Sequence, residues 1–118
     1  MSTKGDHGRK AELLARQLLE AQQLKFIDSN YHCRFGEIDL IMLDKNNTLV
    51  FVEVRYRKNQ QFGGAIESIT HSKQNKLRLT ASHYLQKKNS NKNARFDVVL
   101  LSSLSDTSQI NWIKSAFE

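Results

Sequence analysis

The sequence predicts an α/β domain in which helices cover both faces of a mixed β-sheet, with the elements in the order αβββαβ. Two apolar, β-branched segments separated by a short polar turn indicate an antiparallel hairpin. Both faces of these strands are apolar, so we expect the hairpin to be covered on both sides. A strand, a long helix and a further strand then indicate a right-handed crossover that joins parallel strands.

The first half of the chain gives the helix and three strands of this order. Alanines and leucines at spacings of three and four residues predict a helix from about Gly8 to Gln23. A first strand is expected over Phe26 to Cys33. The hairpin follows, with strands Gly36 to Leu43 and Leu49 to Arg55. Its connector, Asp44 to Thr48, is composed of residues that favour a turn.

The second half supplies the crossover. The polar, glycine-bearing segment Lys58 to Gly64 is expected to be a mobile loop. A second helix is predicted from roughly Ile66 to Lys87, where a cluster of Asn and Ser ends it. A strand over Arg95 to Leu101 follows, and Gln109 to Ile113 is expected to be a short last strand.

Composition indicates one domain over residues 1–118, with about residues 1–7 as a flexible terminus. Lys and Arg number 18 against 12 acidic residues, and the resulting charge of +6 favours a polyanionic partner, nucleic acid first and an anionic membrane second. No segment is apolar and long enough for a membrane span or a signal peptide. The single Cys33 cannot form an internal disulfide. We therefore expect a cytoplasmic protein without a membrane partner.

The hairpin predicts a pair of carboxylates. If Leu43 pairs with Leu49, counting back along both strands places Asp39 directly opposite Glu53. The two Cβ atoms would then lie about 5 Å apart, and like charges in such a pair are destabilising. A divalent cation is the simplest reason for the pair. A register slipped by one residue would separate the two carboxylates.

Two further charges leave alternatives open. In the same register Glu37 lies opposite Arg55, so these residues could form an ordinary ion pair at the rim of the sheet. Lys73 falls on the inward stripe of the second helix, one turn from both Ile69 and Leu77. Either its alkyl stem packs there while the amine stays in water, or the amine reaches an acidic site on the neighbouring sheet.

Five segments resemble a known family. Over about Gly5 to Phe117, the chain looks like the YraN-like family of small bacterial proteins. The segments that carry this resemblance are GEIDLI, VFVEVRYR, FGGA, SKQNKL and RFDVV. This family is regarded as a distant relative of archaeal Holliday junction resolvases within the PD-(D/E)XK nuclease superfamily. The resemblance implies a restriction-endonuclease-like αβββαβ core.

The superfamily motif carries over onto particular residues. Its helical acid resembles Glu12, and its aspartate is Asp39, which follows isoleucine here rather than proline. The (D/E)XK triplet is Glu53, Val54 and Arg55, so an arginine stands where the superfamily usually has lysine. Arginine stays protonated, so it can orient groups and stabilise charge but cannot act as a base.

The resemblance implies a metal-dependent endonuclease that hydrolyses phosphodiester bonds in DNA. Asp39, Glu53 and the Val54 carbonyl would hold Mg²⁺ or Mn²⁺, with Glu12 bound directly or through water. Related nucleases sometimes place the lysine on the helix after the third strand, where Lys73 lies. Lys73 would orient the attacking water, and Arg55 would stabilise charge on the phosphoryl oxygens.

Contacts to nucleic acid are expected from Arg57, Lys58, Gln61 and Lys76, directed at backbone phosphates. No sequence-reading motif is present, so selection of branched, flapped or single-stranded DNA is favoured over sequence recognition. RNA is an alternative substrate. The alternative function is a catalytically inactive, nuclease-like protein that binds nucleic acid or serves as an adaptor, for which Arg55 is the main argument. A homodimer is expected only by analogy with the symmetric resolvases.

Overall fold

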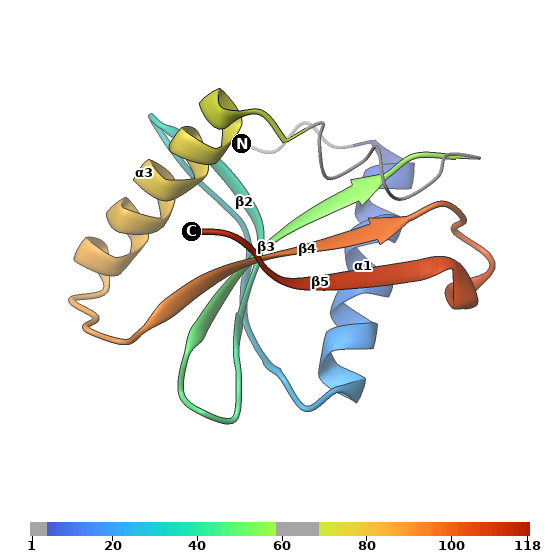
Figure 1. Cartoon of the computed structure of the whole chain (residues 1–118), viewed down its shortest axis with the longest axis horizontal. Helices are drawn as coiled ribbons and strands as arrows, with labels where there is room; N and C mark the ends of the chain where they lie inside the picture. Colours follow the sequence, from blue (N-terminus) through green and yellow to red (C-terminus); the bar gives the residue numbers. More distant parts are fainter. Residues whose placement is uncertain (1–4, 59–68) are drawn as a thin grey trace.

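The computed structural model describes residues 5–58 and 69–118, which form a five-stranded sheet with a helix on each side (Figure 1). The helices and strands follow in this order: α1 (Asp6–Ala21), β1 (Lys25–Cys33), β2 (Gly36–Leu43), β3 (Leu49–Tyr56), α3 (His71–Lys87), β4 (Ala94–Leu101), the 3-10 turn η1 (Thr107–Gln109) and β5 (Ile110–Phe117). The predicted αβββαβ core is confirmed.

The strands lie in the order β1-β2-β3-β4-β5. All neighbours are antiparallel except β3 and β4, which are parallel, so the sheet is mixed as predicted. Parallel neighbours need a long connection, and α3 lies in it. In the hairpin Leu43 pairs with Leu49, and the ladder runs on to the pair formed by Leu40 and Val52. The predicted register is therefore confirmed.

Each face of the sheet is buried under one helix. The face under α1 carries Leu40, Met42, Val50 and Val52, while Ile41, Leu49 and Phe51 pack under α3. Both faces of the hairpin are thus covered, as the two apolar faces predicted. Ile38 is an exception, because it packs on the α3 side although alternation assigns it to the same face as Leu40.

The neighbouring strand β1 departs from strict alternation at the same level. Tyr31 is the partner of Ile38, and it also packs on the α3 side. The preceding residue, Asn30, has a φ of 53°, a left-handed conformation that breaks the extended strand. The side chains on either side of Asn30 therefore do not follow the two-residue period.

Both helix starts differ from the prediction. Helix α1 begins at Asp6 rather than Gly8, because Asp6 suits the first turn of a helix and pairs with Arg9 at 2.6 Å. Helix α3 begins at His71, because the Thr70 side chain caps it and accepts a hydrogen bond from the Lys73 amide at 3.1 Å. The predicted start near residue 66 lies outside the described residues.

The last strand is longer than the predicted segment Gln109 to Ile113. Strand β5 continues to Phe117, whose ring stacks on Phe96 with the centroids 4.9 Å apart. Ser115 has a φ of 49° and interrupts the alternation, which is why the pattern indicated a shorter strand.

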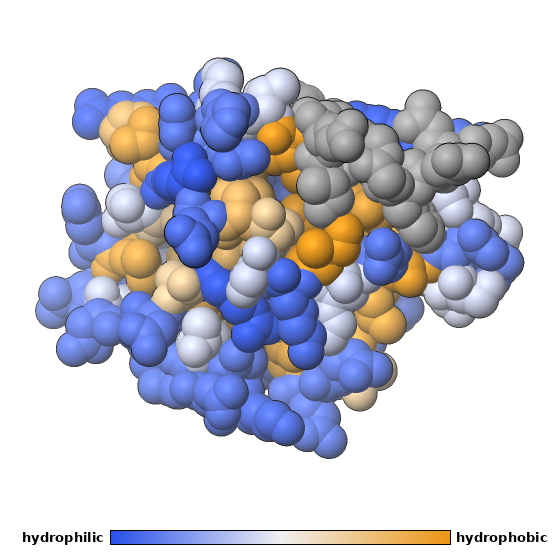
Figure 2. All heavy atoms as spheres, viewed as in Figure 1, coloured by the Kyte–Doolittle hydropathy of each residue, from blue (hydrophilic) through white to orange (hydrophobic). Residues whose placement is uncertain are grey.

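The described surface exposes few large hydrophobic side chains. Figure 2 shows hydrophilic residues around the rim of one face, with hydrophobic residues at its centre. The large hydrophobic side chains that are exposed are Leu13 and Leu79, one on each helix. Single exposed residues of this kind are normal. Neither described helix has the length and apolarity needed to cross a membrane.

Candidate active site

A pocket of about 510 Å³ lies between the start of β2, the end of β3 and the first turns of α3. Besides Glu37, five charged side chains line it: Asp39, Glu53, Arg55, Lys73 and Lys76. Each of these five residues was predicted from the sequence to be catalytic or to contact DNA. The fold therefore brings these residues to one place from three separate elements.

Strands β2 and β3 stop pairing through their backbones at this pocket. Their ladder ends at Leu40 and Val52, and the Val54 amide instead donates to Asp39 Oδ2 at 2.7 Å. The Asp39 side chain thus replaces a main-chain partner, which fixes its carboxylate between the two strands. Asp39 and Glu53 each keep 6% of their surface exposed, so the predicted pair is both formed and buried.

The environment of Glu53 disfavours its charge. Burial and the nearby Asp39 carboxylate raise the pKa of Glu53 from 4.5 to about 7, and a hydrogen bond between the two side chains acts in the same direction. The ammonium group of Lys73 opposes this rise without cancelling it. Two carboxylates held this closely resist simultaneous ionisation unless positive charge is brought to them.

Two cations contact Glu53 directly. Lys73 Nζ lies 2.7 Å from Glu53 Oε2, and Arg55 Nη1 lies 3.6 Å from the same oxygen. Of the two alternatives for Lys73, the structure supports the one in which the amine reaches the acidic site. The Lys73 side chain keeps 39% of its surface exposed, so its amine borders both the carboxylate and the open pocket.

Gly36 sets the distance between α3 and the carboxylates. It has a φ of 155°, and a Cβ at this position would lie 3.2 Å from Thr80 Oγ1 and 3.7 Å from Lys76 Cβ. The missing side chain lets α3 approach the start of β2, which holds Lys73 above the pair. Sequence reasoning missed this role, although glycine in a strand often marks a close approach.

Glu12 stands apart from this pocket. It is buried on α1, where its Oε1 accepts a hydrogen bond from Asn30 Nδ2 at 3.0 Å. It lines two smaller cavities beside α1 but is absent from the lining of the pocket that holds Asp39 and Glu53. Within residues 5–58 and 69–118, no group of three or more His, Cys, Asp or Glu side chains is placed to hold a metal ion. The structure therefore brings Asp39 and Glu53 together in this pocket, while Glu12 lies outside its lining.

The predicted DNA-contacting residues are placed in part. Lys76 is exposed on the wall of the pocket. Arg57 and Lys58 are exposed directly after β3, and Arg57 Nη1 donates to the Tyr56 carbonyl at 3.0 Å. Gln61 lies outside the described residues. Of these described cations, Lys76 therefore lines the pocket, whereas Arg57 lines a separate cavity beside α1.

Together, the fold and this pocket define a small α/β domain with a restriction-endonuclease-like core and a buried carboxylate pair beside a lysine. Residues 11–101 match the model of the uncharacterised protein family UPF0102. The chain belongs to the UPF0102 family, and the predicted YraN-like resemblance is confirmed.

Three relatives illustrate this membership. The chain is 49% identical over 118 residues to a UPF0102 protein of Nitrosococcus oceani, an alignment that covers 98% of this chain and 94% of the relative. It is 48% identical to a UPF0102 protein of Nitrosomonas europaea, covering 100% and 98%. It is also 48% identical to one of Psychromonas ingrahamii, covering 100% and 94%. The description of this family names no activity.

Proposed function

We propose that the protein is a Mg²⁺- or Mn²⁺-dependent endonuclease that hydrolyses phosphodiester bonds in DNA, acting in the bacterial cytoplasm. One observation carries the proposal: two buried carboxylates, Asp39 and Glu53, lie together in a pocket whose wall bears a lysine 2.7 Å from one of them. Burial, together with repulsion from Asp39, raises the pKa of Glu53 to about 7, and a bound cation would favour the charged form.

The donor set suits a hard divalent cation. Mg²⁺ is commonly held by one or two carboxylates and keeps several waters, so the pair supplies enough protein ligands without Glu12. Asp39, Glu53 and the carbonyl of Val54, which also lines the pocket, would hold the ion. When bound, the ion lowers the pKa of a coordinated water and polarises the scissile phosphate.

The other side chains have roles that follow from their chemistry. With a cation held at Glu53, the Lys73 ammonium would be free to orient the attacking water at the edge of the pocket. Arg55 remains protonated and donates to the phosphoryl oxygens as negative charge develops there. Lys76, Arg57 and Lys58 would contact neighbouring backbone phosphates, which makes binding independent of sequence and sensitive to salt. Selection by DNA structure is therefore favoured.

The test is cleavage of labelled four-way junction, flap, single-stranded and duplex DNA with Mg²⁺ or Mn²⁺. The wild-type protein is expected to cut at least one of these substrates, and Glu53→Gln is expected to reduce the rate by about a thousandfold or more, because a metal ligand is lost while the shape of the side chain is kept. A labelled RNA of matched sequence tests the alternative substrate.

The matched control is Glu20→Gln, which makes the same chemical change at an exposed carboxylate on α1. This variant should cut at the wild-type rate. Cleavage that survives in purified, folded Glu53→Gln would show that the activity belongs to another site or to a contaminant.

A second function is favoured by one specific observation. Glu53 already contacts two cations, Lys73 and Arg55, so the pocket is partly neutralised by the protein itself. A protein that only binds nucleic acid, or serves as an adaptor, would need no more than this. It would bind DNA equally well with a chelator present, and neither the wild-type protein nor Glu53→Gln would cut.

A further inference from the structure

A second hollow, of about 230 Å³, lies at the opposite end of the β2–β3 hairpin from the carboxylate pocket. It is bounded by the end of α1, the hairpin turn, the start of β4 and strand β5. We call it the Trp112 hollow, after the residue that supplies its aromatic wall. Lys45, Asn46, Arg95 and Lys114 also line it. None of these residues has a role in the proposed cleavage.

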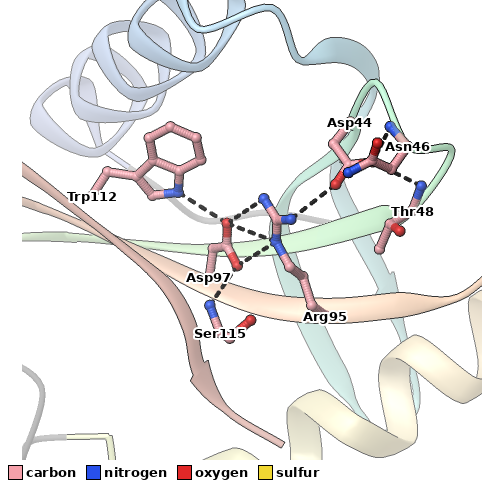
Figure 3. A network of polar contacts seen from close by, with 7 residues as sticks. All are labelled: Asp44, Asn46, Thr48, Arg95, Asp97, Trp112 and Ser115. Atoms are coloured by element: carbon pink, nitrogen blue, oxygen red, sulfur yellow. Dashed lines mark hydrogen bonds and ion pairs between the residues drawn. The ribbon is translucent and has the colours of Figure 1, made fainter.

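The indole of Trp112 is held rigidly by a buried acid (Figure 3). Its Nε1 donates to Asp97 Oδ2 at 2.9 Å, and Asp97 has no exposed surface. The same carboxylate accepts a hydrogen bond from the Ser115 amide at 3.0 Å and an ion-paired one from Arg95 at 3.1 Å. Because the ring is already fixed, it loses no further rotational freedom when a flat partner binds to it.

One face of the indole is open to a cationic side chain. Lys114 Nζ lies 4.6 Å from the centre of the ring, and Trp112 as a whole is only half-buried. Lys114 is itself exposed, so its flexible side chain can give way to a stacking partner. Base stacking on an aromatic side chain strengthens binding and tolerates any sequence, because every base has a flat π-face.

The charge around the ring favours an anion. Lys45 and Lys114 are exposed, and neither forms an ion pair within the part of the chain that the structure describes. The acidic residue in the lining, Asp44, is engaged by Arg95 at 2.9 Å and by two backbone amides of its own turn. The hollow therefore offers an aromatic face beside two available ammonium groups.

We propose that the Trp112 hollow binds one nucleotide of a single-stranded nucleic acid, with the base on Trp112 and the adjoining phosphates at Lys45 and Lys114. A base inside a duplex is already stacked, so an unpaired base is required. The volume suits one base rather than a larger ligand. An acidic protein segment would use the two lysines but has no need of the open indole face. The site stands independently of the metal chemistry proposed for the other pocket.

The test uses Trp112 as its own reporter, because the chain contains a single tryptophan. Its fluorescence is followed in a chelating buffer while oligothymidylate, duplex DNA or poly-glutamate is added to the full chain. Saturable quenching by oligothymidylate, and little by the other two, is expected. Lys45→Glu combined with Lys114→Glu should weaken this binding by about tenfold or more, because two phosphate contacts become repulsive.

The matched control is Lys87→Glu combined with Lys88→Glu, an equal change of charge on exposed residues at the end of α3. It should weaken binding much less. Glu53→Gln should be quenched like the wild-type protein, so this result is separate from the fate of the nuclease proposal. Three results would overturn the inference. Poly-glutamate could quench the fluorescence as much as oligothymidylate does, or both double variants could lose the same binding affinity. A labelled oligonucleotide could also bind without any change in Trp112 fluorescence.

Discussion

Between pH 4 and pH 8, the stability of Glu53→Gln is expected to rise relative to that of the metal-free wild-type protein by about 3 kcal/mol. The folded state raises the pKa of Glu53 from 4.5 to about 7, so it binds this proton more tightly than the unfolded chain does. The contribution of Glu53 to the free energy of unfolding of the wild-type protein is therefore fully present below pH 4.5 and is lost as the pH rises through 7. A separation of about 2.5 pKa units, at about 1.4 kcal/mol each, gives the magnitude. Glutamine does not titrate, so the variant loses no stability through this effect as the pH rises.

Urea unfolding in a chelating buffer at the two pH values measures this difference. Glu20→Gln is again the control, because its carboxylate is exposed and its stability relative to wild type should change little. A stability difference between Glu53→Gln and wild type that is the same at both pH values would show that the folded state does not raise the pKa of Glu53. Added Mg²⁺ should reverse the order at pH 8, because it stabilises only the wild-type site.

Arg95→Met is expected to lower the free energy of unfolding by about 3 to 5 kcal/mol at neutral pH. Asp97 has no exposed surface, and Arg95 contacts both of its carboxylate oxygens, at 3.1 and 3.3 Å. Methionine would fill much of the volume but leave a buried negative charge with only neutral donors, from Trp112 and Ser115. Removing one partner of a buried ion pair lowers the free energy of unfolding far more than removing one partner of an exposed pair.

The comparison variant is Arg9→Met, which removes an arginine from an ion pair with Asp6 on the exposed surface of α1. Its loss should stay below about 1 kcal/mol. Both variants can be unfolded in urea under the same conditions, with the slope checked for a two-state transition. If Arg95→Met lost no more than Arg9→Met, the Asp97 network would contribute little to the fold.

The features that the sequence could predict depend on short-range periodicity. The hairpin register follows from the two-residue alternation and from the length of the turn, so the pairing of Leu43 with Leu49 placed Asp39 beside Glu53 correctly. Lys73 was found because it breaks an apolar helical stripe. The parallel pairing of β3 with β4 followed from the helix between them.

The features that the sequence could not predict depend on contacts between distant segments. The close approach of α3 to Gly36 joins residues 40 or more positions apart in the sequence. The hydrogen bond from Asn30 to Glu12 joins residues 18 positions apart. Glu12 was expected beside Asp39 and Glu53, but helical periodicity fixes only the face on which it lies and not its position along the sheet. The Asp97 network likewise links β4 to β5 and to the hairpin turn, which no local pattern encodes.

The central claim is that Asp39 and Glu53 form a divalent-metal site, and calorimetric titration of Mn²⁺ into the DNA-free protein tests it most directly. Wild-type protein is expected to give a saturable heat of binding, and Asp39→Asn and Glu53→Gln are each expected to lose it, while Glu20→Gln retains it. Wild-type protein that binds no Mn²⁺ at millimolar concentration, or variants that bind it as tightly as wild type, would contradict the assignment of this pair as a metal site.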